Sequence, residues 1–135
     1  MPKTTKAKCL EAAQKLARLQ ESDDNGYCQC WSCGETRHYK EMDGGHFVPK
    51  GKGGGNMWAL DMRNIHPQCK GCNGFQMKHG KAAQQYTLRM IDHYGREFVD
   101  MLLHQNKVTK YSEYDLQVML DDFKKQIKEH EKRIC

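Results

Sequence analysis

Seven cysteines occur in the chain, and four of them form two matched C-x-x-C pairs. Cys30 and Cys33 make the first pair, and Cys69 and Cys72 make the second. The two-residue spacing lets both thiolates of a pair reach one ion, and Zn²⁺ in structural sites prefers a tetrahedral set of sulfur ligands. We therefore predict that these four cysteines bind a structural zinc ion.

The same cysteines allow alternatives. Cys28 is a rival ligand because it would point to the same face of a strand as Cys30, although Cys30 completes a knuckle with Cys33. A redox role for C-x-x-C would need a βαβ setting, which the pattern lacks. The odd number of cysteines argues against a complete disulfide framework, and Cys9 and Cys135 are expected to lie outside the zinc site.

The insert between the two pairs carries a histidine among residues with hard oxygen ligands. His46 suits a general base, because the unperturbed pKa of histidine is about 6.5. Asp43 and Asn73 offer oxygens that suit Mg²⁺, and Asn64 could orient the His46 ring through a hydrogen bond. A base that activates water and a cation that neutralises charge are what hydrolysis of a phosphodiester requires.

These motifs, in this order, resemble the HNH (ββα-metal) nucleases, and within them the phage NinG (Rap) recombination endonuclease family. The matching stretches are NGYCQCWSCG, DGGHFVP, RNIHPQC and CKGCN, and the segment VTKYSEYDLQVMLDDFKKQIKEHEK is also similar to the C-terminal part of that family. The resemblance covers most of the chain from Asn25 onward. It implies a β-hairpin packed on a helix around a catalytic divalent cation, Mg²⁺ or Mn²⁺, and a DNA endonuclease activity.

The resemblance also implies roles for individual residues. His46 matches the general base, Asn64 the middle residue of the motif, and Asn73 a helix position that is often histidine in HNH enzymes. Generic members often place Asp or His directly before the base, where this chain has Gly45. Asp43 lies three residues before the base, which leaves its contact with the cation open. Two histidines are spare candidates for ligands or are simply structural or surface residues: His66 and His79.

The glycine tract KGKGGGN could be a phosphate cradle or a plain loop. It does not match G-x-x-x-x-G-K-[ST], and no helix is expected after its glycines, so a loop between two strands is the better interpretation. Lys50 and Lys52 either contact DNA phosphates from this loop or are only solvated. Further candidates for DNA contacts are Arg63, Lys70 and Lys78.

The bulk properties agree with a nucleic-acid partner. The formal net charge is +5 and the isoelectric point is about 8.8, which fits binding to a polyanion. No apolar run approaches the roughly 20 residues of a membrane span, and the start MPKTTKAKC has no signal-peptide pattern. We therefore expect no membrane association and a cytoplasmic location, in the host cell if the chain is phage-encoded.

The family resemblance suggests branched recombination DNA, such as a Holliday junction, as the substrate. A homodimer would fit two cuts in one junction, and recombination proteins are possible partners. Two other readings stay open: a non-catalytic zinc module that only binds DNA, and an HNH restriction or homing nuclease that acts on linear duplex.

The elements that must position these residues follow from the apolar pattern. We predict an α+β, mainly helical fold with a zinc-stabilised ββα-metal core, as a single domain over residues 1–135. An N-terminal helix and turn would occupy residues 1–25, the zinc-bound core 26–80 and a helical part 81–135. The expected strands are YCQCWSCG, HYKEMDGGHFV and ALDMRNIHPQC.

Apolar residues recur at helical spacing at both ends of the chain. The first helix, from about residue 6 to 20, would bury Leu10, Ala13, Leu16 and Ala17. A helix after Asn73 would present Ala83, Met90, Ile91 and Tyr94 and end at Gly95. A short helix would follow with Phe98, Met101 and Leu102. Ser112 is expected to cap a last helix that carries Leu116, Met119, Leu120, Phe123 and Ile127.

Overall fold

The structure, a computed structural model, describes residues 2–105 and 107–134, so the expectation for Cys135 lies outside the described residues. Small antiparallel hairpins and helices make a mixed, mostly helical fold, as predicted. The strands are β1 (Tyr27–Gln29), β2 (Thr36–His38), β3 (Met42–His46) and β4 (Ile65–Cys69). The helices are α1 (Thr5–Gln20), α2 (Lys70–Asn73), α3 (Phe75–His79), α4 (Ala82–Tyr94), α5 (Arg96–His104) and α6 (Glu113–Arg133).

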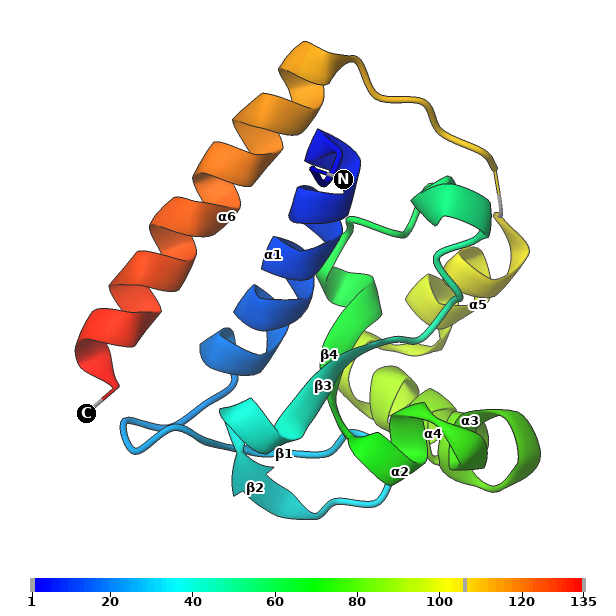
Figure 1. Cartoon of the computed structure of the whole chain (residues 1–135). Coiled ribbons are helices and arrows are strands. Elements are labelled where there is room, and N and C mark those ends of the chain that lie inside the picture. The colour runs from blue at the N-terminus through cyan, green and yellow to red at the C-terminus, as the bar shows by residue number, and fades with distance from the viewer. Residues whose placement is uncertain (1, 106, 135) are drawn as a thin grey trace.

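Helices α1 and α6, from opposite ends of the chain, lie side by side on one flank of the molecule (Figure 1). Thr4 caps α1 by accepting from Ala7 N, and Ser112 caps α6 by accepting from Asp115 N at 3.0 Å, as predicted for Ser112. Their facing apolar stripes form one core, which explains the helical spacing of apolar residues at both ends of the chain. Its members include Ala13, Leu16, Ala17, Leu116, Leu120, Phe123 and Ile127.

The hairpin β3–β4 lies at the centre of the fold, between the α1–α6 layer and the α2–α5 region (Figure 1). Its register pairs Asp43 with Gln68 and Gly45 with His66. Helix α1 packs against one face so closely that a Cβ on Gly44 would lie 2.5 Å from the Gln14 carbonyl oxygen. Because strand side chains alternate between faces, Asp43 and Gly45 belong to the opposite face.

That opposite face is covered by helices α4 and α5, which form a second core. Tyr86 is completely buried, and its hydroxyl donates to the Gly45 carbonyl at 2.7 Å, which ties α4 to β3. The buried residues of α4 are Ala82, Tyr86 and Met90, so Tyr86 takes a place that the predicted apolar face did not include. Gly95, with φ +89°, separates α4 from α5, as expected for a helix stop.

Three segments differ from the sequence prediction. ALDMRNIHPQC forms a strand only in its second half, β4, because a 3₁₀ turn over Met62–Asn64 precedes it. HYKEMDGGHFV does not form one strand, because a 3₁₀ turn over Tyr39–Glu41 divides it into β2 and β3. The glycine tract contains a short turn, Lys52–Gly54, that packs on α1, where a Cβ on Gly54 would lie 2.8 Å from Leu10. None of the described helices has the length and apolar character that a membrane crossing requires.

Candidate metal centre and active site

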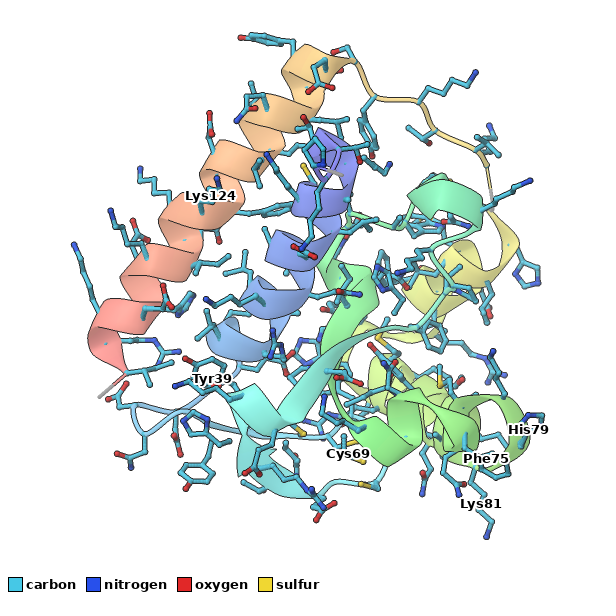
Figure 2. All side chains as sticks on the ribbon, viewed as in Figure 1. Tyr39, Cys69, Phe75, His79, Lys81 and Lys124 are labelled. Atoms are coloured by element: carbon cyan, nitrogen blue, oxygen red, sulfur yellow. The ribbon has the colours of Figure 1, made fainter. Side chains whose placement is uncertain are left out.

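The four predicted cysteines converge on one point. The Sγ atoms of Cys30, Cys33, Cys69 and Cys72 all lie within 4.8 Å of one another. The first pair lies after β1, and the second joins β4 to α2, where Cys69 is labelled among the sulfur atoms of Figure 2. The four sulfurs can therefore hold a zinc ion.

The thiols of the cluster differ in their electrostatics: burial raises the pKa of Cys33 and of Cys72, whereas the pKa of Cys30 is lowered. Burial alone would raise the pKa of Cys30, but backbone N–H groups of Cys69, Cys33 and Ser32 more than offset this and lower it. The Ser32 N–H donates to Cys30 Sγ at 3.4 Å. Cys28 is buried but is not a member of the cluster, whereas Cys30 is.

A second group of polar side chains meets beside the hairpin. The carboxylate of Asp43 accepts from Asn73 Nδ2 at 3.1 Å and from Lys70 Nζ at 2.9 Å. Burial would raise the pKa of Asp43, but these partners more than offset it and lower the pKa, so this carboxylate is ionised at neutral pH. The Lys70 ammonium, on an exposed side chain, shows that this position attracts a positive charge.

These three residues line a hollow of about 260 Å³, together with residues of the first helix and of the segment before β3. Two of those neighbours are basic, Arg18 and Lys40, and the sequence analysis missed both. Arg18 donates to the Tyr39 carbonyl at 3.0 Å and to the Met42 carbonyl at 3.3 Å. No motif marks either residue, because only the packing of α1 on β3 brings Arg18 here.

His46 ends β3, one residue after Gly45. Its Nε2 lies 2.8 Å from the Ala59 carbonyl oxygen, and a carbonyl can only accept, so the neutral ring carries its proton on Nε2. Burial lowers the pKa of His46 below its usual value, although the Ala59 carbonyl opposes this. The ring is therefore neutral at pH 7, with the lone pair on Nδ1 available to accept a proton.

Asn64 is completely buried and holds the loop around His46. Its side chain accepts from Val48 N at 2.8 Å and donates to the carbonyls of Val48 and Trp58 at 2.9 and 3.2 Å. The hydrogen bond expected between Asn64 and the His46 ring is therefore replaced by the one from the ring to Ala59. Asn64 acts on His46 through the backbone of residues 48–59.

Asn73 contacts Asp43 and covers Gly45, the residue that precedes His46. A Cβ built on Gly45 would lie 3.0 Å from Asn73 Oδ1, so the Asn73 carboxamide covers the residue directly before His46. The same carboxamide donates to Asp43. The structure thus brings Asp43 and Asn73 together and places His46 next to the glycine that Asn73 covers.

The two spare histidines lie apart from this group. His66 is buried and stacked on Trp31, with ring centroids 3.5 Å apart. Its Nδ1 lies 2.7 Å from Glu21 Oε2, and its Nε2 lies 2.9 Å from the Arg63 carbonyl oxygen, so both ring nitrogens have protein partners. His79 is exposed at the outer side of α3, near Phe75 and Lys81 (Figure 2).

The predicted DNA-contacting residues are exposed, but two of them have acidic partners. Lys50, Lys52 and Lys78 are free of ion pairs among the described residues. Lys70 pairs with Asp43. Arg63 pairs with Asp61 at 2.7 Å and lies over the Phe98 ring, which holds it in place.

Comparison with known proteins gives one match. The family model described as Bacteriophage Lambda NinG protein matches residues 4–133. Neither curated proteins nor solved structures give a significant match. Since the family model spans nearly the whole chain, including both cysteine pairs, His46, Asn64 and Asn73, this protein belongs to the NinG family of phage proteins.

Proposed function

We propose that this protein is a metal-dependent DNA endonuclease of phage recombination that cuts branched DNA, such as Holliday junctions, with an HNH (ββα-metal) active site. The observation that carries the proposal is the tautomer of His46. Its Nε2–H donates to Ala59, which leaves Nδ1 as a base at the end of β3, the strand that also carries Asp43, while Asp43 is hydrogen-bonded to Asn73. The order of hairpin, β3–β4, and following helix, α2, agrees with a ββα arrangement.

Asp43 and Asn73 fit a hard divalent cation such as Mg²⁺ or Mn²⁺. They offer one ionised carboxylate and one carboxamide oxygen, and the ammonium of Lys70 already occupies a cationic position beside Asp43. When bound, the cation would neutralise charge on the scissile phosphate and polarise it. Lys70, on an exposed side chain, would exchange the carboxylate for a DNA phosphate.

In the proposed reaction, His46 Nδ1 takes a proton from a water molecule, whose oxygen attacks the phosphorus while the bond from phosphorus to the 3′-oxygen breaks. The freed 3′-oxygen takes up a proton from solvent and leaves as a hydroxyl. The Ala59 carbonyl holds the ring in orientation, and the lowered pKa keeps it neutral. Arg18, Lys40 and Lys70 line the hollow beside Asp43 and would bind the backbone phosphates around the cut. The four-cysteine zinc site, at the base of the hairpin and the start of α2, holds β4 and Asn73 in register.

The partners follow from the same proposal. Branched DNA is the expected substrate, and a homodimer would place one site at each of the two strands to be cut. Recombination proteins of the phage or its host are further expected partners, in the host cytoplasm.

The test is cleavage of a synthetic four-way junction in parallel with a linear duplex of the same sequence, with Mg²⁺ and with a chelator. We expect cleavage of the junction that depends on Mg²⁺ and is lost in His46→Ala. Binding of DNA without cleavage would favour a non-catalytic zinc module. Equal cleavage of linear duplex would favour a restriction or homing type of nuclease.

A further inference from the structure

One buried polar atom beside the proposed cation site has no use in the mechanism above. Gln68 is completely buried. Its Oε1 is the one buried side-chain nitrogen or oxygen without a hydrogen-bond partner in residues 2–105 and 107–134. A buried acceptor without a partner is costly and rare, so it needs a reason.

The orientation of the Gln68 amide is fixed by its neighbours. The Ser32 hydroxyl donates its only hydrogen to the Ala82 carbonyl, at 2.8 Å, and so can only accept from Gln68. Gln68 Nε2 donates to it at 2.9 Å and also approaches Met77 Sδ at 3.6 Å. If the amide were flipped, its oxygen would face the Ser32 hydroxyl, which has no hydrogen left to donate to it. Oε1 must therefore face the other way, toward Gly45.

The unpartnered Gln68 Oε1 lies in the space that a side chain at position 45 would occupy. A Cβ on Gly45 would lie 1.8 Å from Gln68 Oε1, which no side chain tolerates. Gly45 has no positive φ, so its backbone conformation does not require glycine, and it is mainly the Gln68 amide, with Oε1 nearest and Cδ at 2.6 Å, that excludes a side chain there. The position before the base, which carries Asp or His in generic HNH sequences, is therefore filled here by an oxygen from the paired strand.

The oxygens around this point converge. Gln68 and Asp43 are directly paired across β3–β4 and share a face. Gln68 Oε1 and Asn73 Oδ1 lie 1.8 and 3.0 Å from the same Cβ position on Gly45. The two oxygens are therefore at most 4.8 Å apart, and a small movement of the exposed Asn73 side chain would bring both to the ligand distance of about 2.1 Å from one cation.

We propose that Gln68 Oε1 is a third protein ligand of the divalent cation that Asp43 and Asn73 would hold. The assignment deepens the proposed function and requires that the cation binds there. Asn73, which is exposed, exchanges its hydrogen bond to Asp43 for the cation, and this opens Gln68 Oε1 to the same ion. Gly45 then leaves the space free, and Gln68 supplies the ligand that generic HNH sequences carry at the position before the base.

The test measures binding of Mn²⁺ to the zinc-loaded full chain by electron paramagnetic resonance of the free ion, with zinc content measured in the same samples. Gln68→Met keeps the shape of the side chain without the oxygen, and we expect Mn²⁺ affinity to fall roughly tenfold or more. Gln68→Glu places a charged oxygen at the same position and should bind Mn²⁺ more tightly than the wild type. The matched control, Ser32→Ala, removes the hydrogen bond from Nε2 and the one to the Ala82 carbonyl but keeps Oε1, and it should cost much less affinity.

Unchanged Mn²⁺ affinity in Gln68→Met, with zinc retained, would overturn the assignment. So would an equal loss in Ser32→Ala, because the amide would then act through its hydrogen bond alone. If Gln68→Met loses its zinc, Gln68→Glu decides, and affinity no tighter than the wild type refutes the ligand role. Loss of Mn²⁺ binding in Asp43→Ala but not in Gln68→Met would leave the proposed function standing without Gln68, whereas a wild type that binds no Mn²⁺ would refute both.

Discussion

The sulfur centre and the oxygen centre of this protein are built from adjacent residues and yet differ in character. At the sulfur centre, four like ligands lie within 4.8 Å of one another, and three of them, Cys30, Cys69 and Cys72, are buried. At the oxygen centre, Asp43 and Asn73 border an open hollow, and Lys70 can move away from it. Structural metal sites are closed and catalytic sites keep an open position. The comparison supports the proposal that the sulfur centre is structural and that the oxygen centre is accessible to a ligand.

Cys69→Ser gives the largest expected effect on stability and tests whether the sulfur centre is structural. Loss of zinc should remove several kcal/mol of folding free energy, because binding of a structural zinc ion is coupled to folding. Thermal unfolding followed by circular dichroism, together with zinc content, measures this. The control is Cys28→Ser, which lies outside the cluster and should keep its zinc. A zinc-free variant with wild-type stability would erase the distinction between the two centres.

His46→Ala should remove the activity assigned to the oxygen centre and leave the sulfur centre intact. Removal of a general base should lower the cleavage rate by about 10²- to 10⁴-fold, while zinc content stays at the wild-type level. Single-turnover cleavage of the four-way junction measures the rate. His79→Ala, on an exposed histidine of α3, serves as the matched control and should retain activity. Full activity in His46→Ala would contradict the role assigned to the ring.

Asn64→Ala sharpens the comparison by weakening the loop between the strands. Three buried backbone groups of Val48 and Trp58 lose their partner, and the expected cost is about 3 kcal/mol of unfolding free energy. Chemical denaturation measures it. We expect cleavage to fall as well, because the Ala59 carbonyl that holds His46 belongs to the same loop. A loss of activity with no loss of stability would instead indicate that Asn64 contacts the reacting groups directly.

The pH dependence of cleavage tests whether the His46 ring is buried and neutral. Burial lowers the pKa of His46, so the neutral form should persist below pH of about 6.5, and the acidic limb of cleavage should lie under that value. The same shift makes acid destabilising: the unfolded chain binds the proton first, so stability is lost as the pH falls below the unfolded pKa. A rate profile at constant zinc content measures the limb. An acidic limb above pH of about 6.5 would contradict the buried, neutral ring.

Replacement of both Lys50 and Lys52 by alanine should have the smallest effect. If both contact phosphates, the slope of log affinity against log salt should fall by roughly 0.9 for each contact. Both side chains are exposed on the loop that follows His46. DNA binding measured at several salt concentrations checks this, with Lys124→Ala, on the outer side of α6 (Figure 2), as the control. An unchanged slope would indicate a solvated loop.

The parts of the site that the sequence predicted are those encoded by short spacing or local chemistry. Two C-x-x-C knuckles specify their own geometry, and the cap at Ser112 depends only on residues within one turn. The parts that sequence analysis missed depend on contacts between distant segments. Arg18 reaches the hollow only because α1 packs on β3. The complete burial of Tyr86 was missed because it depends on a partner for the hydroxyl, the Gly45 carbonyl, that is distant in sequence.

By itself, the sequence predicted the four cysteines that cluster, the two apolar stripes of α1 and α6, and the family, and it singled out His46 as the candidate base. Each is written in residues a few positions apart, where spacing and chemistry suffice. Only the tertiary structure decided which nitrogen of His46 is free, that Asn64 holds the loop and not the ring, and that Gln68 fills the space of an absent side chain at Gly45. Hydrogen-bond partners and close approaches are settled by how strands register and helices pack, and these are properties of the whole chain.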